Sequence, residues 1–141
     1  MEFVHLAVNG TLMGGLELNR NLQAVGGRFV RETMTESAYR LWSINDSYPA
    51  MRRVATGGTA IAVEIWEIPL AGLAKILLQE PPGLCIGKVC LWDGEEVLGV
   101  LGEAILCEGM PEITQWGGWR SYIQDKLKES ERGRGKDGAS L

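Results

Sequence analysis

The sequence predicts a single α+β domain in which a small, mixed and mostly antiparallel β-sheet or β-barrel is flanked by helices. Most of its apolar runs have the length of a strand and are rich in β-branched residues. One segment in the middle of the chain instead repeats its leucines at helical spacing. The 141 residues, 45% hydrophobic and 23% charged, are enough for one core but too few for two.

Strands are expected where short apolar runs stop at glycine, asparagine or proline. They cover residues 3–8, 28–35, 39–44, 59–66, 84–92 and 96–105. Between the last two, Asp93-Gly94 predicts a two-residue hairpin turn, because such a turn needs positive φ angles that this pair tolerates. Residues 45–49, Asn-Asp-Ser-Tyr-Pro, are typical of a loop.

Three segments are expected to be helical. Residues 19–25 have room for one short helical turn before a pair of glycines. Residues 69–78 place leucines and an alanine on one face, and Pro69 suits the first turn of that helix because its missing N–H is not needed there. Residues 116–127 form an amphipathic terminal helix.

The composition limits the extent of the domain and the class of partner. A single domain is expected over residues 1–127, followed by a polar, glycine-containing disordered tail over residues 128–141. The net charge is −4, and the one clear basic cluster lies in this tail among acidic residues, which argues against nucleic-acid binding. No apolar run approaches the roughly 20 residues that cross a bilayer, so no membrane association is expected.

The cysteines and the single histidine offer little for metal or cofactor chemistry. Cys85, Cys90 and Cys107 are not spaced as ligands, and one histidine, His5, lies in the first strand, where a structural role is favoured over catalysis. No nucleotide-binding motif is present, so neither a metal nor a cofactor is expected. Reduced thiols and the lack of a basic, then apolar leader favour the cytoplasm.

A glycine-containing loop follows the first strand over residues 9–15. Asn9, Gly10, Thr11 and Leu12 leave a buried strand through a tight turn, and successive N–H groups in such a turn can bind a carboxylate or a phosphate. A purely structural turn is the alternative interpretation, and the residues alone leave the two open.

Several carboxylates and one arginine are candidates for acid–base chemistry and charge binding. Glu64 and Glu67 face opposite sides of a predicted strand, so at most one of them points inward. Glu80 follows the central helix, and a carboxylate among apolar side chains has a raised pKa. Arg120, between glycines and a tyrosine, can clamp a carboxylate. Structural or solvated roles are the alternative for each.

Short motifs across most of the chain resemble the C-terminal domain of allophanate hydrolases. They include Leu-Ala-Val-Asn-Gly-Thr-Leu at residues 6–12, Val-Glu-Ile-Trp-Glu-Ile-Pro at 63–69 and Thr-Gln-Trp-Gly-Gly-Trp-Arg-Ser-Tyr at 114–122. Tyr-Pro-Ala-Met at 48–51 and Pro-Gly-Leu-Cys-Ile-Gly-Lys-Val at 82–89 extend the resemblance. It covers about residues 4–125, with the motifs in a common order and spacing.

The resemblance implies a gamma-glutamylcyclotransferase-like fold, a small mixed barrel with flanking helices. In that wider fold family a Tyr-Gly-Ser-Leu-type loop holds the substrate carboxylate, and the segment from Asn9 to Leu12 stands at its position. A catalytic glutamate follows a helix in those enzymes, and Glu80 lies close to that place.

The resemblance also implies a reaction and a context. The allophanate hydrolase domain acts on N-carboxycarbamate and promotes its decarboxylation, with a histidine of the first loop carrying the step; Thr11 stands at that position here. In the family an amidase domain normally precedes this domain. This sequence contains no such domain, so a free-standing version is expected.

We therefore expect a cytoplasmic domain that binds or transforms a small carboxylate or carbamate-type metabolite. Asn9, Gly10, Thr11, Leu12 and Arg120 would bind the ligand, and Glu80, Glu64 and Thr11 are the catalytic candidates. The alternative is a non-catalytic accessory or dimerisation domain that docks on an amidase-family protein. A second copy of the chain is a further expected partner.

Overall fold

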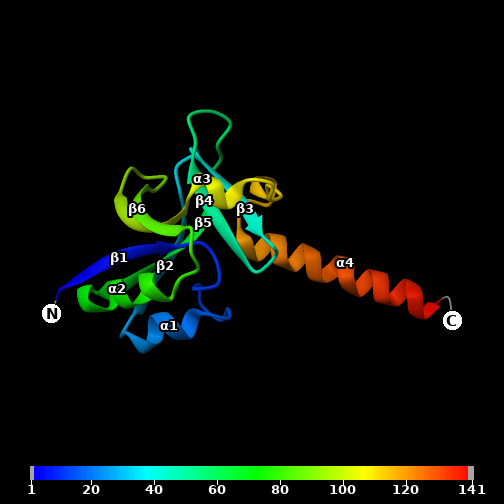
Figure 1. Cartoon of the computed structure of the whole chain (residues 1–141), viewed down its shortest axis with the longest axis horizontal. Helices are drawn as coiled ribbons and strands as arrows, with labels where there is room; N and C mark the ends of the chain where they lie inside the picture. Colours follow the sequence, from blue (N-terminus) through cyan, green and yellow to red (C-terminus); the bar gives the residue numbers. More distant parts are fainter. Residues whose placement is uncertain (1, 140–141) are drawn as a thin grey trace.

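The computed structural model describes residues 2–139 and has the predicted α+β architecture (Figure 1). A five-stranded sheet has the strand order β2-β5-β1-β7-β6, and β3 and β4 form a separate two-stranded sheet. The strands are β1 (Phe3–Val8), β2 (Arg28–Met34), β3 (Tyr39–Ile44), β4 (Tyr48–Arg53), β5 (Ala62–Pro69), β6 (Leu84–Cys90) and β7 (Glu96–Gly102). The helices are α1 (Asn19–Ala24), α2 (Leu70–Gln79), α3 (Ala104–Cys107), the 3-10 helix η1 (Thr114–Trp116) and α4 (Trp119–Ala139).

β1 is the central strand of the larger sheet and is paired on both sides. It runs antiparallel to β5, with Val8 opposite Glu64. It runs parallel to β7, with Leu6 opposite Leu98. β2 and β6 form the two edges, so the sheet is mixed and open and does not close into a barrel. The predicted fold class, a mixed and mostly antiparallel sheet with flanking helices, is confirmed.

The hydrophobic core is centred on β1 and β5. Leu6, Ile65 and Ile68 are completely buried, and Ile76 of α2 belongs to the same cluster. These side chains hold the end of β1 in place, because a closely packed interior resists even small shifts of its members. The point at which the first loop leaves the sheet is therefore fixed by the core.

The β3–β4 hairpin corrects the prediction of a loop over residues 45–49. Only Asn45, Asp46 and Ser47 form the turn, with φ angles of 55° and 56° at the first two, and β4 begins at Tyr48. Asn and Asp tolerate these angles better than most residues, and Ser43 Oγ donates a hydrogen bond to Asp46 at 2.6 Å. Pro49 fits in β4 because both strands of a two-stranded sheet are edge strands.

Two predicted element boundaries differ from the structure. Pro69 ends β5 in an extended conformation, with φ −59° and ψ 141°, and α2 begins one residue later. The predicted strand over residues 96–105 is too long, because β7 ends at Gly102 and Ala104–Cys107 turn into the short helix α3. The other strands and α1 lie within a few residues of their predicted ranges.

The terminal helix is longer than the sequence predicts. α4 runs from Trp119 to Ala139, through the region from residue 128 where a disordered tail is expected, and it points away from the sheets (Figure 1). Its outer part is rich in Lys, Glu and Arg, which are good helix formers. No helix among the described residues has both the length and the apolar character needed to cross a membrane.

Candidate functional site

The first loop leaves the end of β1 and is held by buried contacts. The Asn9 side chain, 3% exposed, donates a hydrogen bond from Nδ2 to the Val100 carbonyl of β7 at 2.9 Å. Gly10 lies against Pro49 of β4 so closely that a Cβ atom on Gly10 would be 2.5 Å from Pro49 Cδ. The Met13 N–H donates to the Gly10 carbonyl at 2.9 Å and closes the turn. A larger residue than glycine at position 10 would separate the loop from β4.

Gly10→Ala is expected to lower the free energy of unfolding by about 1–3 kcal/mol, because the rigid proline ring cannot turn away from the added methyl group. Equilibrium unfolding in urea measures the change. Gly14→Ala is the matched control in the same loop, since its Cβ would make only ordinary contacts, at 3.6 Å or more. Equal losses in the two variants would show that the contact with Pro49 is not the cause.

The loop carries backbone donors that the protein leaves unpaired. Among the described residues, no hydrogen bond is made by the N–H groups of Gly10, Thr11 or Leu12. Gly10 and Leu12 are buried. Buried N–H groups are nearly always paired in folded proteins, with protein, water or a ligand. These donors are therefore available to an anion at the end of β1.

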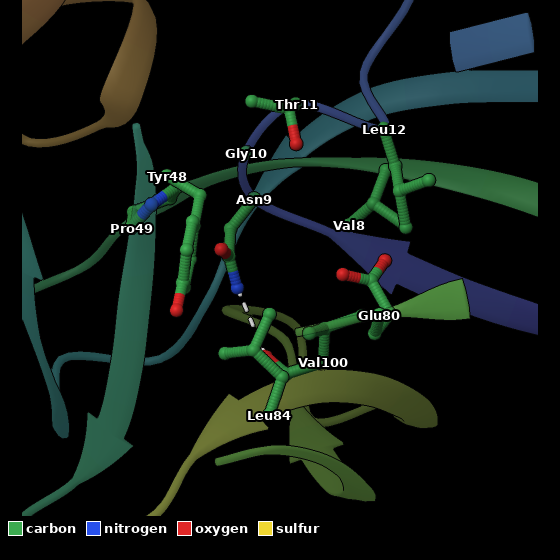
Figure 2. Close-up of a pocket in the computed structure, with 10 residues that line it drawn as sticks. All are labelled: Val8, Asn9, Gly10, Thr11, Leu12, Tyr48, Pro49, Glu80, Leu84 and Val100. Atoms are coloured by element: carbon green, nitrogen blue, oxygen red, sulfur yellow. Dashed lines mark hydrogen bonds between the residues drawn. The ribbon is translucent and has the colours of Figure 1, made fainter. Parts of the chain in front are cut away.

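A small cavity lies beside this loop and is lined from several elements (Figure 2). Its lining residues are Val8, Asn9, Gly10, Thr11, Leu12, Tyr48, Pro49, Glu80, Leu84 and Val100. The structure thus brings the predicted loop residues together with Glu80, although about 70 residues separate them in sequence. The cavity volume is about 20 Å³, room for about one water molecule.

Glu80 reaches the cavity from the end of α2. The helix stops at Gln79, and the backbone of Glu80 is extended, with φ −72° and ψ 151°, as expected for a residue that precedes a proline. Burial raises the pKa of the Glu80 carboxyl to about 7. Both protonation states are therefore populated at neutral pH, which is the condition for a general acid or base.

Tyr48 is a cavity residue to which the sequence analysis assigns no role. Figure 2 shows its ring on the opposite side of the Asn9 amide from Glu80. Burial and the negative charge of Glu80 raise the pKa of the Tyr48 hydroxyl, which therefore stays protonated at neutral pH. Tyr48 begins the Tyr-Pro-Ala-Met motif of the family resemblance, but its place at the cavity depends on the pairing of β3 with β4 and does not follow from that motif.

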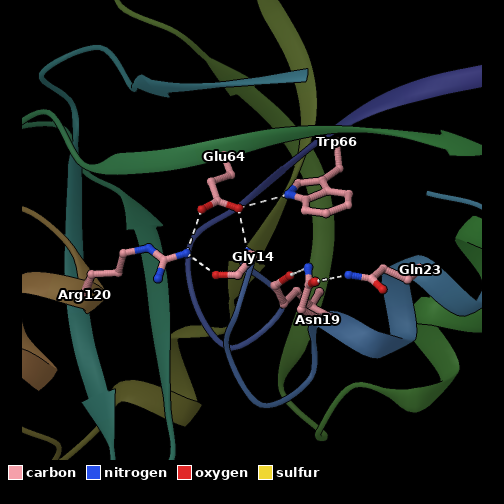
Figure 3. A network of polar contacts seen from close by, with 7 residues as sticks. Gly14, Asn19, Gln23, Glu64, Trp66 and Arg120 are labelled. Atoms are coloured by element: carbon pink, nitrogen blue, oxygen red, sulfur yellow. Dashed lines mark hydrogen bonds and ion pairs between the residues drawn. The ribbon is translucent and has the colours of Figure 1, made fainter. Parts of the chain in front are cut away.

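Glu64 and Arg120 do not line this cavity but form a separate polar network behind the first loop (Figure 3). Arg120 Nη2 lies 2.8 Å from Glu64 Oε2 and also donates to the Gly14 carbonyl. Glu64 Oε1 accepts hydrogen bonds from the Gly14 N–H at 2.8 Å and from Trp66 Nε1 at 3.0 Å. The network ties the first loop to β5 and α4.

This network keeps Glu64 ionised. Burial by itself raises the pKa of the Glu64 carboxyl, but hydrogen bonds from Gly14, Arg120 and Trp66 and the positive charge of Arg120 outweigh burial, and the pKa lies below its ordinary value. Glu64 is therefore poorly suited to exchange protons at neutral pH. The strand pattern predicts that at most one of the two carboxylates points inward, and in the structure this is Glu64, whereas Glu67 pairs with Arg28 at the surface.

The remaining titratable residues add no metal site. Within residues 2–139, no group of three or more His, Cys, Asp and Glu side chains could hold a metal ion. His5 lies opposite Glu67 in the β1–β5 pairing and is not a cavity residue. Cys85, Cys90 and Cys107 are free thiols.

Comparison with known families identifies the relationship. The family model described as the allophanate hydrolase C-terminal domain matches residues 4–124 of this chain. The chain belongs to that family. The urea amidolyase of Saccharomyces cerevisiae is 31% identical over 137 residues, which cover 92% of this chain but 8% of the yeast protein. This allophanate hydrolase C-terminal domain therefore spans less than a tenth of that curated relative.

Solved structures extend the relationship. The crystal structure of c4763, described as a uropathogenic E. coli-specific protein, is 60% identical with a TM-score of 0.87, and the match covers 88% of this chain and 98% of that one. Kluyveromyces lactis allophanate hydrolase is 30% identical with a TM-score of 0.83, and the match covers 89% of this chain and 22% of that one. A gamma-glutamyl cyclotransferase, 11% identical with a TM-score of 0.51, shares the fold. The resemblance and the fold predicted from the motifs are confirmed.

Proposed function

We propose that this domain binds or transforms a small carboxylate or carbamate-type metabolite in the cavity at the end of β1. The observation that carries the proposal is the meeting of unpaired loop N–H groups with a glutamate whose pKa is about 7. The names of its relatives, urea amidolyase and allophanate hydrolase, support a role in urea or allophanate nitrogen metabolism. A cytoplasmic location fits the free thiols.

The ligand's carboxylate would be held by the loop. The N–H groups of Gly10, Thr11 and Leu12 and the Thr11 hydroxyl would donate to it. Because the cavity has room for about one water, binding requires side chains at its mouth to move. Protonated Glu80 then donates a hydrogen bond to the bound anion instead of repelling it.

In this proposal Glu80 is the group that gives a proton to the bound ligand or takes one from it. The resemblance places a histidine at position 11, but the hydroxyl of Thr11 donates a hydrogen bond without titrating near neutral pH. Glu64 stays ionised and bonded to Arg120, so it supports the loop from behind. Among the catalytic candidates, Glu80 alone combines a place in the cavity with a pKa near 7.

A second candidate function is that of an accessory domain which docks on an amidase-family hydrolase or on a second copy of the chain. The occurrence of this domain within larger proteins favours this second function. In Kluyveromyces lactis allophanate hydrolase, the part that matches this chain is 22% of the protein. Such a domain can keep the fold without turnover.

Titration calorimetry with a panel of small carboxylates and carbamates tests the proposal. At least one is expected to bind, and Thr11→Val is expected to weaken it roughly tenfold, the effect of losing a hydrogen bond of about 1.5 kcal/mol to a charged group. Thr56→Val, in an exposed loop, is the control and should bind like the wild type.

The two candidate functions predict different results in this titration. Equal binding by wild type and Thr11→Val would exclude the Thr11 hydroxyl as a donor. No binding by any member of the panel at millimolar concentration would favour the accessory domain.

A further inference from the structure

A second, larger cavity lies between the β2–β5 edge of the sheet and the first turn of α4. Its volume is about 370 Å³, within the range of sites that hold metabolites. Its lining includes Met13, Met34, Ala62, Val63, Trp119 and Arg120. It shares no lining residue with the cavity at the end of β1, so an inference about it does not depend on the proposed function.

Most of this second cavity is apolar. Met13 and Trp119 are buried, and Met34 of the edge strand β2 is 38% exposed at the rim. Thioether and indole groups offer a polarizable surface on which an aromatic or alkyl group can pack. The cavity therefore suits a ligand with an apolar body.

Arg120 supplies hydrogen-bond donors that the protein does not use. Its Nη2 atom is engaged by Glu64 and the Gly14 carbonyl, whereas Nε and Nη1 have no acceptor among the described residues. Its side chain is 40% exposed, and Figure 3 shows Nη1 pointing away from Glu64. A guanidinium nitrogen that the protein leaves free, such as Nη1, can donate a hydrogen bond to a second carboxylate.

The negative end of the same ion pair is covered. The Glu64 side chain is 5% exposed, and its oxygens already accept hydrogen bonds from Gly14, Trp66 and Arg120. The cavity therefore presents the donors of Arg120 and shields the acceptors of Glu64. An incoming acceptor group therefore finds the donors of Arg120 there, whereas Glu64 offers little to an incoming donor group.

Glu32 limits the charge of the ligand. It lies directly opposite Glu64 in the β2–β5 pairing, on the same face of the sheet, and it is exposed at the cavity. Arg120 neutralises Glu64, so Glu32 leaves these three groups with one net negative charge. This net charge opposes every anion to some extent, and it opposes a ligand with two or more negative charges more strongly than a monocarboxylate, which has the donors of Arg120 to offset it.

We propose that the second cavity is a binding site for an organic monocarboxylate with an apolar body. The carboxylate would accept a hydrogen bond from Nη1 of Arg120, and the body would pack on Met13, Met34 and Trp119.

Phenylacetate and its neutral analogue phenylacetamide are suitable probes, followed by amide chemical shifts in NMR titrations. Phenylacetate is expected to shift the amides of Met13, Ala62 and Gly118 in a saturable manner, with a Kd on the order of millimolar. Phenylacetamide should bind at least about tenfold more weakly, because it offers no charge to Arg120.

Two variants separate this site from the first cavity and from loss of folding. Met34→Trp fills the rim and leaves the Glu64–Arg120 pair intact, so it should weaken phenylacetate at least about tenfold. The double variant Glu64→Gln with Arg120→Met removes both charges of the ion pair. It should weaken phenylacetate binding by a similar factor. Glu80→Gln, in the cavity at the end of β1, should leave phenylacetate binding to the second cavity unchanged.

Three results would overturn the proposal. The first is phenylacetamide binding as tightly as phenylacetate. The second is unchanged phenylacetate affinity in Met34→Trp. The third is no saturable binding, or shifts confined to residues 9–12, which would assign the probe to the first cavity.

Discussion

Arg120→Met is expected to lower the free energy of unfolding by about 3 kcal/mol, at the lower end of the range for breaking a buried ion pair. The substitution leaves the Glu64 carboxylate buried and without its counter-charge. Gly14 and Trp66 still donate hydrogen bonds to it, and Arg120 is partly exposed, so the higher end of that range is not expected. Urea unfolding at pH 7 measures the loss.

Two comparisons isolate the cause. Arg28→Met breaks the surface pair with Glu67, and a loss of about 0–1 kcal/mol is expected there because exposed pairs contribute little. Adding Glu64→Gln to Arg120→Met should restore part of the stability, because a neutral amide is less costly to bury than a carboxylate. If the double variant is less stable than Arg120→Met, the unpaired charge is not what destabilises the single variant.

Glu80→Gln is expected to abolish the pH dependence of carboxylate binding in the first cavity. In the wild type only protonated Glu80 accepts an anion so close to it, and with a pKa of about 7 its protonated fraction falls about a hundredfold between pH 6 and pH 9. The Kd should rise by about the same factor, whereas the neutral glutamine variant should bind equally at both pH values. Calorimetric titration at pH 6, 7, 8 and 9 measures this.

The raised pKa of Glu80 also predicts how the free energy of unfolding changes with pH. The Glu80 pKa of about 7 in the folded chain exceeds its value of about 4.5 in the unfolded chain, so the folded state binds more protons between these values. The contribution of Glu80 to the free energy of unfolding therefore falls as pH rises through this window and stays low above it. Glu80→Gln should gain stability relative to the wild type from pH 4 to pH 8. A constant difference would show that the pKa of Glu80 is not raised.

Local patterns were sufficient for most of the fold. β1, β5 and α2 follow from apolar runs and helical spacing, because burial of those side chains decides the local structure. β4 does not follow, because Asn-Asp-Ser-Tyr-Pro has loop composition, and its last two residues, Tyr48 and Pro49, become part of a strand only by pairing with β3. The helical region beyond residue 128 could not be predicted either, because its polar, glycine-containing sequence has no apolar face that would indicate a helix.

The candidate site could be predicted only in part. The loop from Asn9 to Leu12 and the vicinity of Glu80 follow from the strand–glycine pattern and from the family resemblance. The separation of Glu64 and Arg120 from that loop does not, because it depends on which face of β5 the start of α4 packs against. The place of Tyr48 at the cavity could not be predicted either, because it depends on the pairing of β3 with β4.

The parallel pairing of β1 with β7 has a consequence for biosynthesis. Leu6 pairs with Leu98, 92 positions later in the chain, so the centre of the sheet cannot be completed until β7 has left the ribosome. Domains with such high contact order fold slowly, because a long loop must close before its contacts form. β1, the first strand of this domain, therefore stays with an apolar and unpaired edge until β7 is available. A nascent chain stalled before β7 would be a natural substrate for chaperones that shield exposed strands.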